Sequence, residues 1–301
     1  MTTLPRTDLA SDPGKGNLRG AALMVVAMAG FALEDMMIKL MAGALPVGQI
    51  LVLLGAGGAL AFGLLLTARG ERIVTPDLWR GSVLARNLCE AVGTFGFVTA
   101  IALIPISLAS TILMAVPLVL TVAAVFLLGE RVGWRRWVAV SLGFLGVLMV
   151  LRPGFEGFDP ASLFALLGVL GLAFRDIAAR KVPPEVSSLH LAVWGFAVLV
   201  PLGLIVMATA GTPWVALDAR LGAMLAAAIV IGLGAYYTLV AATRLGEVSA
   251  VVPFRYSRIV FAMIVGVVVF AERPDALTLL GATLIVATGL YAAWRERLSR
   301  R

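Results

Sequence analysis

The 301-residue sequence contains little charge, one cysteine and one histidine. Charged side chains make up 14% of the chain, against about a quarter in a typical soluble domain. Cys89 is the only cysteine, which excludes an intramolecular disulfide. His190 is the only histidine, is expected to be solvated at a loop edge, and belongs to no HExxH motif, and the sequence has no GxSxG motif or Walker-type loop. We therefore predict no enzyme, no resident metal or cofactor and no nucleotide-driven pump.

Hydrophobic residues make up 61% of the chain, and the mean hydropathy is +1.02. A helix needs about 20 mostly apolar residues to span a bilayer, where it satisfies its own backbone hydrogen bonds. Apolar runs predict an all-α integral membrane protein of ten transmembrane helices. They cover residues 19–42, 46–67, 83–104, 106–129, 134–152, 160–181, 188–210, 220–243, 248–271 and 275–294.

The loops between these runs differ in positive charge. With the N-terminus taken as cytoplasmic, sixteen Lys and Arg residues fall on that side and three on the other, namely Arg152, Arg220 and Arg273. Cytoplasmic loops retain positive charge, so both termini are predicted to be cytoplasmic. Residues 1–18 are polar, lack a signal-peptide core and are expected to form a disordered cytoplasmic tail. The net charge of +7 thus reports topology in a bacterial inner membrane and not nucleic-acid binding.

The second half of the chain repeats the first. The stretch AVFLLGER ends a run that begins near Ser107, and GVVVFAER ends a run that begins near Ser249; serine and glutamate are 23 residues apart in both. Near the start of each half, FALED matches LAFRD. The repeats are predicted to span 19–152 and 160–295. Because five helices is an odd number, the halves have opposite orientations, with Glu130 cytoplasmic and Glu272 external. Such inverted repeats are typical of transporters.

The stretches AIALIPISLAS and PLVLTVAAVFLLGERVGWRRW, together with VVPFRYSRIVFAMIVGVVVFAERPDALTLLGATLIVATG, resemble the EamA repeats of the drug/metabolite transporter superfamily. The resemblance implies a ten-helix secondary carrier that exports small metabolites, amino acids among them, by alternating access. Its central cavity would be lined by the first, third, fourth, sixth, eighth and ninth helices. Nucleotide-like or sulfonium metabolites, drugs, or a channel function are alternatives. No obligate protein partner is indicated.

Nine charged residues lie within the predicted spans. At the centre of a helix each costs about 2.5–3.5 kcal/mol for insertion, so each is expected to be paired or to face a wet cavity. These residues are therefore the leading site candidates: Lys39, Arg86, Arg175, Arg255, Arg258, Glu34, Asp35, Glu90 and Asp176.

Arg258 is the strongest candidate for binding the carboxylate of an amino-acid substrate, because arginine stays charged when buried and offers two parallel donors, and Arg255 is a further substrate-binding candidate. At i and i+3 they share a helix face, with Tyr256 and Ser257 between them. The first half has Met114-Ala115-Val116 where the second has Tyr256-Ser257-Arg258. The alternative is a structural ion pair of Arg258 with Glu90, Asp35 or Asp176.

Asp35 and Asp176 occupy equivalent repeat positions, which favours gating or proton coupling, with Glu34 beside them. The alternative pairs them with Lys39 and Arg180 at i+4. Glu90 is either a substrate contact or is neutralised by Arg86, four residues earlier.

Further candidates are aromatic, sulfur-containing or helix-breaking residues. Glu130 and Glu272 end helices, where nearby arginines are expected to compensate them. Pro117 and Pro253 are expected to kink helices beside the cavity. A wall for apolar substrate groups is predicted from Tyr236, Tyr237, Trp194, Met114 and Tyr256.

Overall fold

The computed structural model describes residues 13–130, 132–154, 158–245 and 248–299, and all of the regular structure in them is helical. This confirms the predicted all-helical class, while the orientation of the two termini stays a prediction. The elements are α1 Pro13–Ala42, α2 Val47–Ala68, η1 Pro76–Trp79, α3 Gly81–Leu103, α4 Ile106–Leu113, α5 Val116–Leu128, α6 Trp134–Leu151, α7 Ser162–Ala179, α8 Ser188–Ala197, α9 Leu199–Ala210, α10 Ala219–Leu245, α11 Val248–Val251, η2 Val252–Tyr256, α12 Ser257–Phe270 and α13 Ala276–Ser299.

Eight helical segments of the described chain are long and apolar enough to cross a membrane. The predicted third and tenth spans fall outside this set. The third, α3, carries Arg86 and Glu90, and the apolar part of α13 is the shorter Ala276–Ala292. The chain is thus a multi-pass membrane protein, while the number of ten spans stays a prediction. Trp79, Trp134 and Trp214 are all more than half exposed, as expected for an interfacial aromatic belt.

Three of the predicted spans are broken. The fourth divides into α4 and α5 around Met114 and Ala115, and the ninth passes through the 3-10 turn η2 before α12 begins at Ser257. Pro117 lies in the first turn of α5 and Pro253 in η2, so both prolines lie where their predicted spans are interrupted, while a cavity beside them stays a prediction. The seventh divides into α8 and α9 at Val198.

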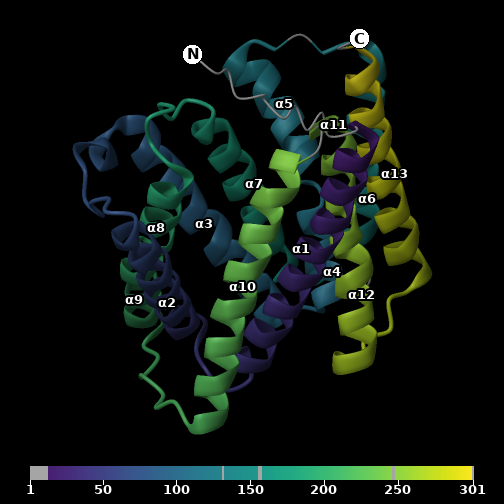
Figure 1. Cartoon of the computed structure of the whole chain (residues 1–301). Coiled ribbons are helices and arrows are strands. Elements are labelled where there is room, and N and C mark those ends of the chain that lie inside the picture. The colour runs from purple at the N-terminus through teal and green to yellow at the C-terminus, as the bar shows by residue number, and fades with distance from the viewer. Residues whose placement is uncertain (1–12, 131, 155–157, 246–247, 300–301) are drawn as a thin grey trace, which may run out of the picture.

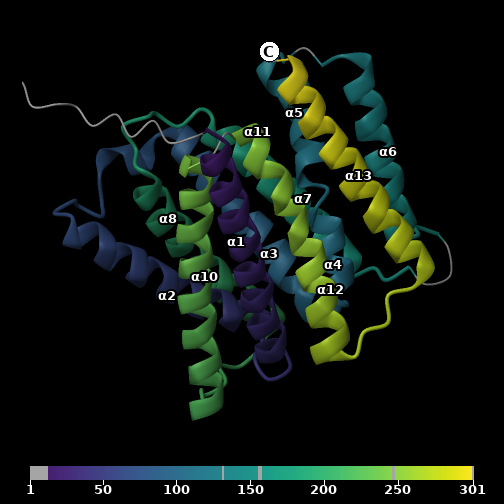
Figure 2. The ribbon, with the colours of Figure 1, turned by 45° about the vertical axis from the view of Figure 1, so that its right-hand side comes forward.

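The helices pair as a two-fold relation between the halves requires. α1 packs along α10, and α7, the equivalent of α1, packs along α3, the equivalent of α10. The pairs α6 with α13, and α2 with α8 and α9, each join equivalent segments. Figures 1 and 2 show α1 and α10 side by side and α6 beside α13. α1 begins and α13 ends at the same end of the bundle (Figure 1).

Two local expectations are wrong. Residues 13–18 belong to α1 and not to a disordered tail, because Pro13 lacks only an N–H that a first helical turn leaves unpaired; residues 1–12 lie outside the described part. His190 is buried and not solvated: Nδ1 lies 2.8 Å from Ser187 Oγ and Nε2 lies 3.0 Å from the Arg72 carbonyl oxygen.

Candidate functional site

Arg258 lies in the interior between α12 and α1. Its Nη2 donates to Asp35 Oδ2 at 2.7 Å, and the guanidinium carbon lies 5.3 Å from the ring centroids of both Phe31 and Phe97. Asp35 is 3% exposed. The ion pair that was the alternative for Arg258 is therefore formed, with Asp35 as its partner. Because two rings and a carboxylate already hold the guanidinium, only part of its donor capacity remains for a ligand.

A second charge cluster joins α3 to α7. Glu90 pairs with Arg86 at 2.7 Å and with Arg175 at 3.1 Å, and Arg175 also pairs with Asp176 at 2.7 Å. Arg86 additionally donates to the Leu191 carbonyl at 2.8 Å. The prediction that Arg86 neutralises Glu90 is confirmed, and the pairing of Asp176 with Arg180 is wrong. All four side chains of the cluster have protein partners, as expected of charges kept inside a bilayer.

Arg255 differs from the other interior arginines. It forms no hydrogen bond or ion pair within the described residues, and its side chain is accessible. It nevertheless lies within electrostatic reach of Asp176, Arg175 and Arg258, which come from α7 and α12. An accessible guanidinium surrounded by charges of other helices faces a wet interior. Although Arg255 and Arg258 were predicted to act together, the break after η2 gives them different surroundings.

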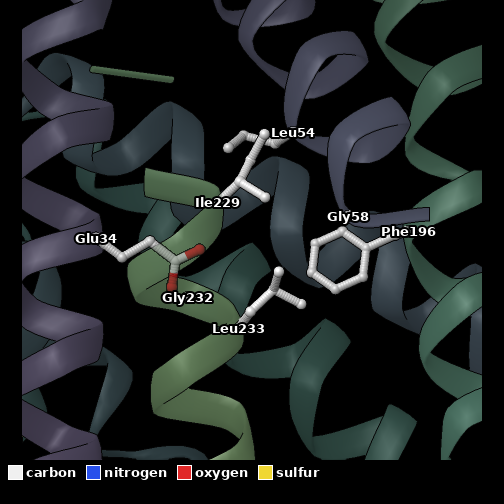
Figure 3. A pocket seen from close by; sticks show the side chains of 7 residues that line it. All are labelled: Glu34, Leu54, Gly58, Phe196, Ile229, Gly232 and Leu233. Carbon is white, nitrogen blue, oxygen red and sulfur yellow. The ribbon is translucent and has the colours of Figure 1, made fainter. Parts of the chain in front are cut away.

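Glu34 projects from α1 into a small pocket that Figure 3 shows from close by. The other lining residues come from α2, α8 and α10, and are Leu54, Gly58, Phe196, Ile229, Gly232 and Leu233. In the described part of the chain Glu34 has no hydrogen-bond or ion-pair partner. Its neighbour Asp35 points the other way, toward Arg258. A carboxylate without a partner in apolar surroundings is energetically unfavourable, so this pocket is a candidate ligand site.

The predicted aromatic wall is not assembled. Trp194 donates to the Ile73 carbonyl at 2.8 Å, and Tyr236 packs edge-on against Phe62 in the same peripheral cluster. Tyr237, the next residue on α10, is 76% exposed, because consecutive helical residues point to different faces. Met114 and Tyr256 belong instead to the main core.

Tyr256 and Ser257, two further candidates of the second half, make their contacts within that half of the chain. The buried Tyr256 ring packs against Gly289 of α13, where a larger residue would leave it no room. Ser257 Oγ donates to the Phe254 carbonyl at 2.7 Å.

One end of the bundle is closed by residues that sequence reasoning did not assign to a site. Glu272 accepts hydrogen bonds from Ile106 N at 2.6 Å, Ser107 N at 3.1 Å and Ser107 Oγ at 2.6 Å. It thereby caps α4, and the expectation that an arginine compensates it is wrong. The repeated serine and glutamate were the available signal, but only the fold shows that they meet across the halves.

Lys39 reinforces the same end. Its Nζ donates to the carbonyls of Ile101 at 2.9 Å and Ile104 at 2.6 Å, at the end of α3, and lies 5.4 Å from the Phe270 ring centroid. The predicted pair with Asp35 is therefore not formed. At the opposite end Glu130 pairs with Arg180 at 2.5 Å, with both side chains largely exposed.

Known proteins resemble this chain over most of its length. S-adenosylmethionine uptake transporter of Rickettsia felis is 28% identical over 217 residues, covering 71% of this chain and 72% of the relative. Riboflavin transporter of Rhizobium johnstonii is 28% identical over 228 residues, covering 74% and 72%. Pseudopaline exporter of Pseudomonas aeruginosa is 28% identical over 278 residues, covering 89% and 93%.

A solved structure also shares the fold, with a TM-score of 0.60 and 19% identity over 94% of this chain and 99% of that one. The described residues include no group of histidine, cysteine, aspartate or glutamate arranged to hold a metal. The EamA-like transporter family matches residues 18–152 and 159–292, one repeat in each half. The chain therefore belongs to the EamA-like transporter family and is a membrane transporter.

Proposed function

We propose that this protein is a secondary carrier for small amino-acid-derived metabolites that bear both a carboxylate and a cationic group. It would cross the membrane ten times with both termini in the cytoplasm, and would operate by alternating access around the interior charges. Sixteen against three basic residues on the two sides support this topology. The inverted pairing of the helices supports a site between the halves.

The observation that carries the proposal is the accessible Arg255 without a partner. A guanidinium binds a carboxylate through two parallel hydrogen bonds, and Arg255 forms no such bond with a carboxylate of the described residues, although Asp176 lies within electrostatic reach. Arg258, the residue first expected in this role, is already held by Asp35. We therefore assign the substrate carboxylate to Arg255 and leave Arg258 to stabilise the helices around it.

Some of the relatives are consistent with this substrate class, whereas riboflavin, named in another, carries neither a carboxylate nor a cationic group. S-adenosylmethionine, named in several of them, carries a carboxylate, an ammonium group and a sulfonium group. The relatives include both an uptake transporter and an exporter. The direction of transport by a secondary carrier follows the gradients of its substrate and of any coupled ion. The family resemblance implies export.

The proposal is tested with purified protein in liposomes loaded with S-adenosylmethionine, leucine, phenylalanine or riboflavin, by counterflow of the labelled compound. Saturable counterflow of at least one zwitterion is expected. Arg255→Gln should weaken its apparent affinity about 10- to 100-fold, because a charge-assisted hydrogen bond contributes about 1.5–3 kcal/mol. The matched control is Arg220→Gln, which removes an arginine at the exposed start of α10.

Three results contradict the proposal. Flux that never saturates and shows no counterflow identifies a channel. Transport of riboflavin alone, unaffected by Arg255→Gln, shows that the carboxylate assignment is wrong. Equal effects of Arg255→Gln and Arg220→Gln also exclude a specific role for Arg255.

A further inference from the structure

The α1–α10 and α3–α7 interfaces are equivalent residue by residue. Gly30 of α1 lies against Ala235 of α10, where an added Cβ would come within 2.9 Å of the alanine Cβ. Gly171 of α7 lies in the same way against Gly93 of α3. Subtraction gives 171 − 30 = 141 and 235 − 93 = 142. The two close contacts therefore lie at equivalent positions of the repeat, offset by 141 residues on one helix and 142 on the other.

The same offsets relate the charged positions. Glu34 corresponds to Arg175, since 34 + 141 = 175, and Glu90 corresponds to Gly232, since 90 + 142 = 232. In the α3–α7 interface these positions hold the Arg175–Glu90 ion pair at 3.1 Å. In the α1–α10 interface they hold Glu34 and Gly232, and a Cβ on Gly232 would lie 2.5 Å from Glu34 Oε1. One interface thus contains an ion pair at these positions, and the other contains the Glu34 carboxylate lying against Gly232, with no opposite charge at the equivalent position.

The pocket at that place indicates what would fill it. Glu34 is the only charged residue in its lining, and Leu54, Phe196, Ile229 and Leu233 supply apolar walls (Figure 3). An anion beside apolar groups and an aromatic ring attracts a cation that carries alkyl substituents, because such a cation loses little hydration on burial. A strongly hydrated metal ion would find a single carboxylate and no further oxygen ligand in the lining.

We propose that Glu34 binds the cationic end of the substrate, a sulfonium or alkylammonium group that takes the place of the missing basic partner. This inference rests on the proposed function, since the bound cation belongs to the molecule carried. It also divides the substrate between two contacts from different halves, with its carboxylate at Arg255 of the second half and its cation at Glu34 of the first. Arg258 lies electrostatically close to both contacts, and its partner Asp35 lies close to Glu34.

The test uses two ligands that differ by one charge. S-adenosylmethionine has a methylated, positively charged sulfur, and S-adenosylhomocysteine lacks that methyl group and charge. Binding of both is measured on the full-length protein in detergent, for wild type, Glu34→Gln and the exposed control Glu185→Gln. Glu34→Gln should weaken S-adenosylmethionine binding by at least about tenfold and change S-adenosylhomocysteine binding by less than about twofold, as expected for loss of a buried charge partner. Glu185→Gln should change neither.

Trimethylsulfonium serves as a second probe, detected by ligand-observed NMR, because it isolates the cationic end from the rest of the substrate. Binding to wild type and loss with Glu34→Gln is expected. An unchanged preference between the two adenosyl compounds in Glu34→Gln, or no trimethylsulfonium binding to wild type, overturns the inference. Saturable counterflow of a zwitterion with either of those results leaves the carrier proposal intact, and trimethylsulfonium binding without counterflow refutes only the carrier.

Discussion

Glu272 and Glu130 occupy the same position in the two repeats and behave differently. Glu272 is inserted at the start of α4, where it accepts two backbone N–H groups and the Ser107 hydroxyl. Glu130, at the opposite end of the bundle, pairs with Arg180 on the surface. Ile106 and Ser107 are almost completely buried, whereas the side chains of Glu130 and Arg180 are 40% and 47% exposed.

This difference distinguishes the two ends of the bundle. We call the Glu272 end, where buried hydrogen bonds join the two halves, the fastened end. At the Glu272 end α4 packs closely against α12, while α5 and α11 have no packing of that extent in the parts that the structure describes. Under the predicted topology the fastened end is the external one. Under the proposed alternating access, the two ends would exchange these arrangements, and contacts present at only one end would set the balance between the two states.

The largest effect is expected from Glu272→Gln. The glutamine keeps one acceptor but loses the charge that strengthens three hydrogen bonds at the α4 start, so the free energy of unfolding should fall by about 2–3 kcal/mol. Thermal unfolding of the protein in detergent measures this. Ser107→Ala, which removes only the hydroxyl contact, should give a smaller decrease of about 1 kcal/mol. Equal stability of Glu272→Gln and wild type would mean that this end is not fastened by Glu272.

Glu272→Gln is also expected to open the end of the bundle where Glu272 caps α4, and cysteine labelling measures this opening. Ser110 lies one turn inside Ser107 on the same face of α4, and its buried Oγ has no partner among the described residues, so cysteine replaces it with little disturbance. In a Cys89→Ser background, Ser110→Cys should react slowly with a membrane-impermeant maleimide added outside, and several-fold faster with Glu272→Gln. Faster reaction with Glu130→Gln instead would reverse the assignment of the fastened end.

A somewhat smaller effect is expected from Lys39→Met. The methionine fills similar space but leaves the Ile101 and Ile104 carbonyls without their charged donor, which should lower the free energy of unfolding by about 1.5–3 kcal/mol. Lys39→Arg retains a donor and should recover at least half of the loss in the same thermal assay. If Lys39→Arg lowers the free energy of unfolding as much as Lys39→Met does, the shape of the lysine side chain and not its charge stabilises this end.

Glu130→Gln should change the stability by less than about 1 kcal/mol, because exposed ion pairs contribute little and solvent screens them. The comparison between the two ends depends on this contrast. If chemical denaturation shows that Glu130→Gln is as destabilising as Glu272→Gln, the two ends are fastened equally and the asymmetry described here does not exist.

The smallest effect concerns Asp275 and Arg152, an exposed pair between α6 and α13 at the fastened end. The hydrogen bond from Arg152, together with those from Thr278, lowers the pKa of the Asp275 carboxyl. A lowered pKa means that the stabilisation is complete above the unfolded-state pKa of about 3.9 and is lost as the pH falls through the folded-state value. Asp275→Asn should therefore lower the unfolding temperature slightly at pH 7 and make it less sensitive to acid below about pH 4. An identical acid profile for wild type and variant would contradict this.

Much of the fold could be predicted from the sequence because a bilayer imposes simple rules. Long apolar runs predicted helices that the structure contains, and prolines predicted the breaks at Pro117 and Pro253. The Arg86–Glu90 pair was also predictable, since helix geometry alone brings i and i+4 together. The proposed aromatic wall failed for a related reason: sequence order does not say which face of a helix meets which neighbour.

The sequence by itself determined the helical membrane class, the repeat and the set of interior charges, because apolar length, period and residue identity are local properties. The tertiary structure decided which charges are paired. Only packing across the halves places Arg258 against Asp35, Glu272 against Ser107 and Arg175 against Glu90. It also leaves Arg255 and Glu34 without protein partners in the described chain, because those pairings depend on helices that are distant in sequence and meet only in the folded bundle.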